Sequence, residues 1–402
     1  MASTFDIAQA RSRFPALKQD QVFLDNAGGS QVLDSIIDSL HAYLSRTNVQ
    51  LGATYNVAKS CNAAYDEAYR AAAKFINASP DEISVGVSTT QLLHNLSTAL
   101  DFQPGDELIL SKLNHEANIS PWVRIAQRLG LMVKWWSAVD NVNPVCDVEE
   151  LKSLLSEKTR LVTCPHAPNI TGTITRVKEI ADVVHSFPRA LLCVDGVALA
   201  PHRQVDVKAL DVDFYAFSWY KVYGPHIAQL YASSRIHSQI SPLGHYFKGT
   251  ETLDLRLNLA STNYELAQTI PRILEYFGSD VASAWEQIAT YEEKLQGILL
   301  QYLNSNERIT VYGEPSASKE RRVPVISFTV KGMKSQAVVE EVERRSQFGF
   351  RNGHMYSHRL VKEVLGLEDV DDGVVRVSML HYNTEDEIKG LVKVLEEIIV
   401  PN

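Results

Sequence analysis

A lysine that follows an apolar run is the residue of this chain whose surroundings most favour chemistry. The segment Asp213-Phe-Tyr-Ala-Phe-Ser-Trp-Tyr-Lys221 is rich in aromatic residues, and Gly224-Pro225 comes soon after it. Aromatic neighbours shield an amine from water, so that it loses its proton and becomes a nucleophile for an aldehyde cofactor. The alternative is a lysine at a strand end that simply reaches solvent, as most lysines do.

A carboxylate ends the preceding apolar run, Leu192-Cys-Val-Asp195-Gly196. A buried aspartate without a partner is costly, so it needs a cation close to it. The protonated pyridine nitrogen of pyridoxal 5'-phosphate (PLP) is such a cation, and an aspartate beside it keeps the ring an electron sink. The alternative is an aspartate that caps the following helix.

Alternating strands and helices are expected to position these side chains. Brief apolar runs predict strands, and the stretches between them have helical spacing of apolar residues. The predicted strands are Glu107–Leu113, Leu131–Ser137, Leu161–His166, Leu191–Val197 and Asp213–Trp219, and the predicted helices are Thr90–Asp101, Ser120–Gly130, Val148–Lys158 and Arg176–Ser186. This alternation is typical of a mostly parallel sheet covered by helices, which binds its ligands at the carboxyl ends of the strands. We therefore expect chemistry just after Leu113, His166, Val194 and Trp219.

The pattern changes after about Asn263 and predicts a smaller α+β domain. Its predicted elements are helices at Val281–Leu303 and Ser335–Arg345, strands at Arg308–Tyr312, Val323–Lys331 and Val374–Tyr382, and a last helix from Thr384. Thr384 with Glu387 fits a capping box. The predicted division is a PLP-binding large domain over 21–275 and a small domain over 276–402, joined by the N-terminal segment 1–20.

Five motifs follow one another in the order of a known family. Besides the segments at Asp195 and Lys221, they are Asn114-His115-Glu-Ala-Asn118-Ile-Ser-Pro-Trp122, His166-Ala-Pro-Asn169-Ile-Thr-Gly172-Thr and Val375-Arg376-Val-Ser-Met-Leu-His-Tyr382. Together they resemble the class V aminotransferase or cysteine desulfurase group of fold-type I PLP enzymes. The resemblance implies an α/β fold with a seven-stranded type of sheet and a covalent link between Lys221 and PLP. It also implies that His115 stacks on the ring, Asn169 contacts its phenolic oxygen and Arg376 holds the substrate carboxylate.

The phosphate of the cofactor is expected at Ser88-Thr89-Thr90-Gln91, which opens a predicted helix. Free N–H groups at a helix start suit a phosphate, although ordinary capping by Ser88 is the alternative. The resemblance makes Thr90 and Gln91 the candidates, with further contacts from Ser218 and Tyr220. In relatives the neighbouring subunit contributes a phosphate contact at the position of Ser261 and Thr262, which implies a homodimer with shared active sites.

One loop departs from the desulfurase pattern Arg-x-Gly-His-x-Cys. This chain has Arg351-Asn-Gly-His-Met-Tyr356, with a tyrosine at the position of the cysteine. A persulfide needs a thiolate, which a phenol cannot replace. Cys164 and Cys193 fall in predicted core strands, where cysteine is usually an inert apolar residue. We add Arg351, Tyr356 and Asn26 as candidate substrate contacts.

The chain also resembles a fungal natural-product subgroup of these enzymes, the subgroup that includes the ustiloxin-pathway decarboxylative aldolase. Shared segments include Lys158–Cys164, Ser218–Lys221, Pro201–Arg203 and His245–Phe247. The likeness implies a lyase or aldolase of secondary metabolism, in which elimination or decarboxylation of an amino acid precedes carbon–carbon bond formation with an aldehyde co-substrate. The alternatives are a cysteine desulfurase or β-lyase that works without a persulfide cysteine, and a non-catalytic regulatory protein with the same fold.

The composition of the 402 residues narrows the partners and the compartment. Hydrophobic residues make up 45% and charged residues 22%, with a net charge of -9, a balance that is typical of a soluble globular enzyme and argues against a nucleic-acid-binding face. The four cysteines have no metal-ligand spacing, which predicts no metal site and favours a reducing compartment. Neither a signal peptide nor a membrane span is expected, so the predicted location is the cytoplasm.

Overall fold

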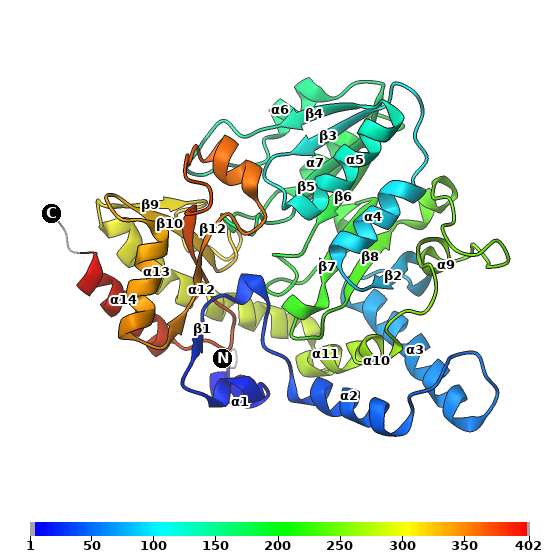
Figure 1. The fold of residues 1–402 in the computed structure, drawn as a ribbon, viewed down its shortest axis with the longest axis horizontal. Coiled ribbons are helices and arrows are strands. Elements are labelled where there is room, and N and C mark those ends of the chain that lie inside the picture. The colour runs from blue at the N-terminus through cyan, green and yellow to red at the C-terminus, as the bar shows by residue number, and fades with distance from the viewer. Residues whose placement is uncertain (1–4, 400–402) are drawn as a thin grey trace.

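A seven-stranded sheet forms the larger part of the computed structural model, which describes residues 5–399 (Figure 1). Its strands are β2 (Ile83–Gly86), β3 (Glu107–Ser111), β4 (Met132–Trp136), β5 (Thr159–Pro165), β6 (Leu191–Asp195), β7 (Phe214–Ser218) and β8 (Ala228–Ala232). Their order is β2-β8-β7-β6-β5-β3-β4, and β8 runs antiparallel to both of its neighbours while the other pairs are parallel. The predicted mostly parallel sheet is confirmed.

Helices cover both faces of this sheet, as the alternating pattern predicts. In β3, Leu108 and Leu110 pack into one core while Ile109 packs into another, so both faces of the strand are buried. The helices on the first face are α4 (Thr89–Ala99), α5 (Ser120–Leu129) and α9 (Leu253–Leu257), and those on the second include α3 (Asn56–Phe75), α6 (Val148–Leu154), α7 (Val177–Val184), α8 (Val207–Leu210) and α11 (Ile270–Phe277). Burial on both sides explains why the strands are almost continuously apolar.

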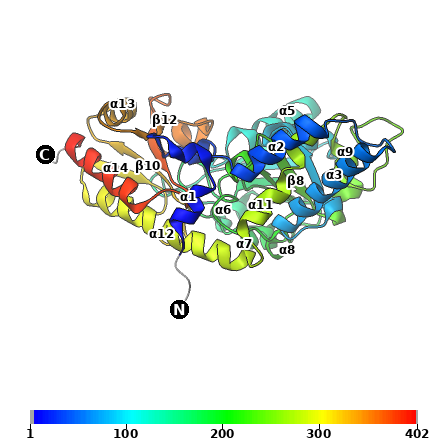
Figure 2. The same cartoon turned by 90° about the horizontal axis from the view of Figure 1, so that it is seen from below.

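A smaller antiparallel sheet lies beside the large one. Its order is β12-β13-β10-β9, made of Arg351–Gly353, Val374–Ser378, Val325–Val330 and Ile309–Tyr312. It packs with α12 (Val281–Ser305), α13 (Ser335–Arg345) and α14 (Glu385–Ile398) around a third core. The long helix α12 connects the two regions: Trp285 and Ile288 pack in the core of the large sheet, whereas Leu295 and Leu299 pack in the third core (Figure 2).

The N-terminal segment crosses from the large region to the small one. After α1 (Ile7–Ser12), the short strand β1 (Val22–Phe23) pairs in parallel with β11 (Phe348–Gly349). Next to it, Asp25 forms an isolated bridge with Ser378, so that the chain passes the end of β13 before α2 (Asp34–Arg46) returns to the large region. α10 (Tyr264–Ala267) lies against α2 and α3. No helix within residues 5–399 is long and apolar enough to cross a membrane.

The predicted boundaries agree with most of these elements to within a few residues. Two differences of four residues are the largest. α6 ends at Leu154 instead of Lys158, because Leu155 is extended and Ser156 and Thr159 form a turn that leads into β5. β13 ends at Ser378 instead of Tyr382, because Leu380 and Asn383 form a turn. The capping box of α14, with Thr384 and Glu387, is confirmed. The sequence pattern did not locate β2 and β8 individually. The predicted limit between residues 275 and 276 falls inside α11.

Candidate active site

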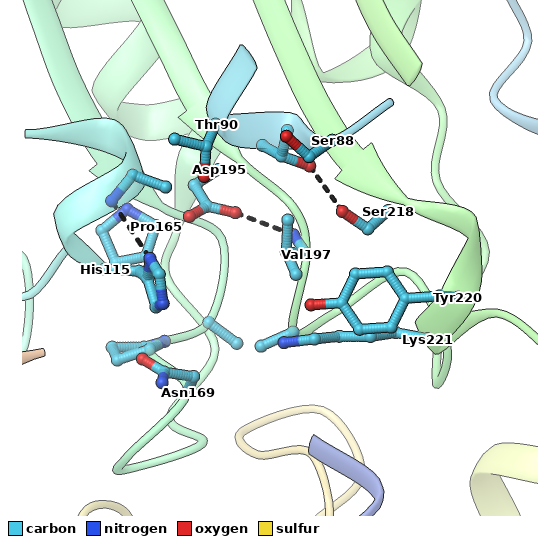
Figure 3. A pocket seen from close by; sticks show the side chains of 15 residues that line it. Ser88, Thr90, His115, Pro165, Asn169, Asp195, Val197, Ser218, Tyr220 and Lys221 are labelled. Carbon is cyan, nitrogen blue, oxygen red and sulfur yellow. Dashed lines mark hydrogen bonds between the residues drawn. The ribbon is translucent and has the colours of Figure 1, made fainter. Parts of the chain in front are cut away.

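A pocket opens at the carboxyl ends of the strands, where chemistry was expected. The empty space in it, counted together with the open solvent at its mouth, is about 540 Å³ (Figure 3). Its lining combines an amine, a carboxylate, an imidazole and several hydroxyl groups with small apolar side chains. The lining residues are Ser88, Thr89, Thr90, His115, Ala117, Pro165, Ala167, Pro168, Asn169, Asp195, Val197, Ala198, Ser218, Tyr220 and Lys221.

Lys221 ends a single 3-10 turn, Trp219–Lys221, directly after β7. The residue is 6% exposed, and its Nζ lies 5.8 Å from the centre of the Tyr220 ring. Burial, helped by the nearby Arg376 charge, lowers the pKa of the Lys221 amine to about 8, while Asp195 opposes this shift. Roughly a tenth of the amine is therefore unprotonated at pH 7, far more than for an ordinary lysine. The interpretation of Lys221 as a solvated lysine does not fit the structure.

Asp195 is the last residue of β6 and is buried. Its Oδ1 accepts a hydrogen bond of 2.9 Å from the Val197 N–H, so the backbone contact foreseen for a capping aspartate is present. Burial nevertheless raises the pKa of the Asp195 carboxyl, because one backbone N–H does not replace the lost hydration. The carboxyl lines the pocket, and a cation placed there would stabilise its charged form.

His115 follows β3 and forms one wall of the pocket (Figure 3). Its Nδ1 accepts a hydrogen bond of 3.1 Å from the Ala117 N–H, which leaves the ring proton on Nε2 of the neutral imidazole. Burial, together with the Lys221 and Arg376 charges, lowers the pKa of His115 to about 3. The imidazole is therefore a neutral planar ring over the whole physiological pH range, which suits stacking on an aromatic cofactor ring.

Hydroxyl groups gather where α4 begins. The Ser88 side chain caps this helix by accepting from the Gln91 N–H at 3.1 Å, so capping and pocket lining occur together. The Thr89 and Ser218 hydroxyl oxygens lie 2.7 Å apart and join the helix start to the end of β7. Gln91 itself does not line the pocket, since its amide packs close to Gly86. Of the two predicted phosphate contacts on α4, Thr90 lines the pocket, together with Ser88 and Thr89, and Gln91 does not.

Two arginines from the small sheet converge on one carboxylate beside the pocket. Arg351 and Arg376 are directly opposite each other on β12 and β13. Asp25 accepts from Arg376 Nη2 at 2.7 Å and from Arg351 Nε at 2.6 Å. Arg376 is 1% exposed and its Nη1 also donates to the Asn169 carbonyl at 3.1 Å, whereas the Arg351 side chain is 47% exposed. Burial lowers the pKa of Arg376, and Asp25 opposes that shift.

Of the other two candidate substrate contacts, Asn26 is buried and Tyr356 is exposed. The Asn26 amide is fully used inside the protein, because Nδ2 donates to the Phe23 and Ser378 carbonyls at 2.9 Å and Oδ1 accepts from Tyr382. Asn26 thus holds the chain next to Asp25 and does not line the pocket at Lys221. Tyr356 is 69% exposed, with its ring 5.6 Å from that of His115.

Ser261 and Thr262 lie outside the pocket formed by their own chain. They belong to the segment between α9 and α10, and Ser261 is exposed and has a positive φ of 53°. Sequence reasoning missed several residues that do line the pocket, among them Ser88, Thr89 and Ala167. Each of these is adjacent or close in sequence to a residue that was predicted, so proximity to the motifs was the available signal.

The pocket fits PLP in the kinds of groups that it brings together. An amine of lowered pKa suits an aldehyde, a buried carboxyl with one hydrogen bond suits a pyridinium, and the hydroxyls at the start of α4 suit a phosphate. With the strand order of the sheet, this defines the class of protein as a fold-type I PLP-dependent enzyme.

Comparisons with known proteins agree with that class. Residues 22–391 match the family described as aminotransferase class-V, and the chain belongs to that family. It is 53% identical to the aminotransferase-like protein FGM3 of Gibberella zeae, over 99% of this chain and 100% of the relative. It is 39% identical to the cysteine desulfurase-like protein ustD of Aspergillus flavus, over 99% of this chain and 92% of the relative. The cysteine desulfurase CsdA of Escherichia coli superposes with a TM-score of 0.85 and 25% identity, over 99% of this chain and 100% of CsdA.

Proposed function

We propose that this PLP enzyme acts at the α-carbon of an amino acid, with elimination or decarboxylation followed by carbon–carbon bond formation with an aldehyde. The observation that carries the proposal is the gathering around Lys221 of groups that suit PLP, combined with a tyrosine, Tyr356, where the desulfurase pattern has its cysteine. The relative ustD of Aspergillus flavus, named a cysteine desulfurase-like protein, supports a PLP enzyme related to the cysteine desulfurases.

The residues have separate tasks in this proposal. When bound, PLP supplies an electron sink that stabilises a carbanion at the substrate α-carbon. The Lys221 amine would hold the cofactor and, with its lowered pKa of about 8, would be able to accept a proton from the substrate α-carbon. Asp195 would pair with a pyridinium nitrogen, and His115 would cover the ring. Ser88, Thr89, Thr90, Ser218 and Tyr220 are the proposed phosphate contacts.

The substrate side is assigned to the arginines. Arg376 is buried and fixed by Asp25 and the Asn169 carbonyl, so it can orient a carboxylate with little loss of side-chain freedom. Arg351 is the more exposed second cation of this site. Small apolar residues on the pocket wall, Pro165, Ala167, Pro168, Val197 and Ala198, limit the access of water to the reacting carbon.

A persulfide mechanism has no suitable thiol in this structure. All four cysteines of the chain are buried. Burial raises the pKa of Cys164 and Cys193 far above the usual range and that of Cys146 to about 12. None of them lines the pocket. A β-lyase that releases sulfur directly remains the alternative enzyme, since it requires only the groups at Lys221.

A substrate screen separates these functions. Purified holoenzyme is incubated with single amino acids, including cysteine and cysteine sulfinate, with and without added aldehydes, and the products are identified by mass spectrometry. A product whose mass joins amino acid and aldehyde carbons supports the proposal. Pyruvate, ammonia and sulfide from cysteine, with no joined product, overturn it in favour of the β-lyase. Alanine, with sulfide released only when a thiol reductant is added, overturns it in favour of the desulfurase. A protein that shows no visible absorbance band of lysine-bound cofactor would instead be the non-catalytic regulatory protein.

The homodimer also belongs to the proposal. Ser261 is exposed and Thr262 is half-buried in the single chain, and we propose that they contact the phosphate in the pocket of the partner subunit. Mixing two inactive variants, Lys221→Ala and Thr262→Ala, tests this sharing, since a mixed dimer would regain one intact site. Absence of any regained activity after subunit exchange would contradict a shared site.

A further inference from the structure

The turn at residues 353–357 has an unusual backbone next to the pocket. Met355 and Tyr356 are consecutive non-glycine residues with positive φ, 41° and 61°, and Gly353 before them has a φ of 116°. L-residues adopt this region at a cost, so that two in succession persist only where surrounding contacts hold them, commonly at functional sites. The contacts that hold this turn therefore indicate its purpose.

Asn169 supplies the main side-chain contact that holds the turn. Its Nδ2 donates to the Met355 carbonyl at 3.0 Å, and its Oδ1 accepts from the Ser357 hydroxyl at 2.7 Å. At the other side of the turn, the Glu116 N–H donates to the Tyr356 carbonyl at 2.9 Å. Both anchors come from segments that line the cofactor pocket, the one that carries Asn169 and the one that follows His115.

The direction of these hydrogen bonds fixes which way the Asn169 amide faces. A carbonyl oxygen can only accept, so the Met355 carbonyl requires the Nδ2 side of the amide. The oxygen side then faces Ser357, which is fully buried and donates to it. Only one of the two Nδ2 hydrogens is used by Met355, and Asn169 lines the pocket beside His115 (Figure 3).

We propose that Ser357 is a positioning residue that acts through Asn169. The Ser357 hydroxyl fixes the orientation of the Asn169 amide, so that one Nδ2 hydrogen remains for the phenolic oxygen of PLP. The fixed amide also holds the Met355 carbonyl, which keeps Tyr356 next to His115 at the mouth of the pocket. The proposal rests on the proposed function, because it assumes that the pocket holds PLP. It goes beyond that function by linking the electronic state of the cofactor to a turn of the small region.

This link predicts two effects when the Ser357 hydroxyl is removed. A hydrogen bond to a phenolate favours its charged form, so a less well oriented Asn169 makes the oxygen more basic. In Ser357→Ala, the pH midpoint of the visible absorbance band of lysine-bound cofactor is expected to rise by ~0.5 to 1 unit, the equivalent of one neutral hydrogen bond. The loosened turn is also expected to admit small reagents, so that hydroxylamine removes the band roughly threefold faster.

A matched control is available in Ser327. It is also fully buried and donates to a backbone carbonyl, that of Ile170, the residue after Asn169, but it does not touch the amide. Ser327→Ala therefore loses a buried hydroxyl close by and should leave both readouts at the wild-type value. Ser357→Thr keeps a hydroxyl and should restore them. Ser357→Cys, a weaker donor of similar size, covers the case in which Ser357→Ala does not fold.

The outcomes are distinguishable. A raised midpoint in Ser357→Ala or Ser357→Cys, reversed in Ser357→Thr and absent in Ser327→Ala, supports the positioning role. A midpoint equal to that of the wild type in Ser357→Ala, together with a shift in Asn169→Ala, overturns it, since Asn169 would then act without Ser357. If the wild-type protein itself shows no band on addition of PLP, the proposed function has failed, which is a different result.

Discussion

The floor of the pocket and its rim differ in how their charges are balanced. On the floor, Asp195 and Lys221 are buried with few partners, and burial moves the pKa of both towards the neutral form. At the rim, Arg351 and Arg376 already share the carboxylate of Asp25. The floor therefore suits a ligand that brings its own opposite charges, whereas the rim is an ion cluster that, under the proposed function, a substrate carboxylate would join. We expect changes on the floor to abolish function and changes at the rim to tune it.

The strongest test of the floor is Lys221→Ala. Loss of both the covalent link and the proton acceptor is expected to lower kcat by about 10³-fold or more, and the visible band should be absent from protein dialysed free of amino acids. Absorbance spectra and turnover of the joined product measure the two effects. Lys178→Ala, on the exposed face of α7, is the control and should keep both. An unchanged band in Lys221→Ala would remove the central assignment.

Asp195→Asn tests the other half of the floor with almost no change in shape. The amide keeps the acceptor for the Val197 N–H but loses the charge that supports the pyridinium, so kcat/KM is expected to fall by ~10² to 10³-fold while folding is retained. Steady-state kinetics and equilibrium dialysis of PLP are the measurements. Asp34→Asn, which also removes a carboxylate charge but one that pairs with Arg13 away from the pocket, should behave as the wild type. Equal activity of the two variants would contradict the role of Asp195.

The floor was also the part most accessible to sequence reasoning. Asp195 and Lys221 lie at or just after the ends of β6 and β7, two parallel neighbours whose apolar runs are clear in the sequence, so their meeting at one edge follows from the topology. The family motifs added His115 and Asn169. The rim was less predictable, because Asp25 reaches the arginines through an isolated bridge to Ser378 across 353 residues of chain, and no local pattern specifies such a contact.

The same limit explains the two displaced candidates. Asn26 is used by the carbonyls of Phe23 and Ser378, which a local motif does not show. The Gln91 amide points away from the pocket because Gly86 has no Cβ, and the amide fills the space that a Cβ would occupy. Both are consequences of packing between distant segments, whereas Asp195 and Lys221, which line the pocket, lie at or just after the ends of single strands.

The lowered pKa of Lys221 predicts how capture of the cofactor depends on pH. Only the unprotonated amine attacks an aldehyde, so the capture rate rises as pH increases through the pKa and levels off above it. With a pKa of about 8, the rate should rise about tenfold between pH 7 and 9 and then change little. His115, with a pKa of about 3, adds no step in this range. The appearance of the visible band after PLP is mixed with apo-protein measures the profile, and a rate still rising steeply above pH 10 would indicate an ordinary solvated lysine.

The rim is expected to respond more mildly and unequally. Arg376 is buried and held from both sides, by Asp25 and the Asn169 carbonyl, so Arg376→Lys loses a planar, oriented donor pair. KM for the amino acid should rise about fivefold with a smaller change in kcat, because the carboxylate contact is made equally in the ground state and the transition state. Arg351→Lys should change KM by less than about twofold, since its charge is exposed and screened. Equal effects of the two substitutions on KM would show that the arginines act as one unit. The proposed difference between a firmly held Arg376 and a more mobile Arg351 would then be wrong.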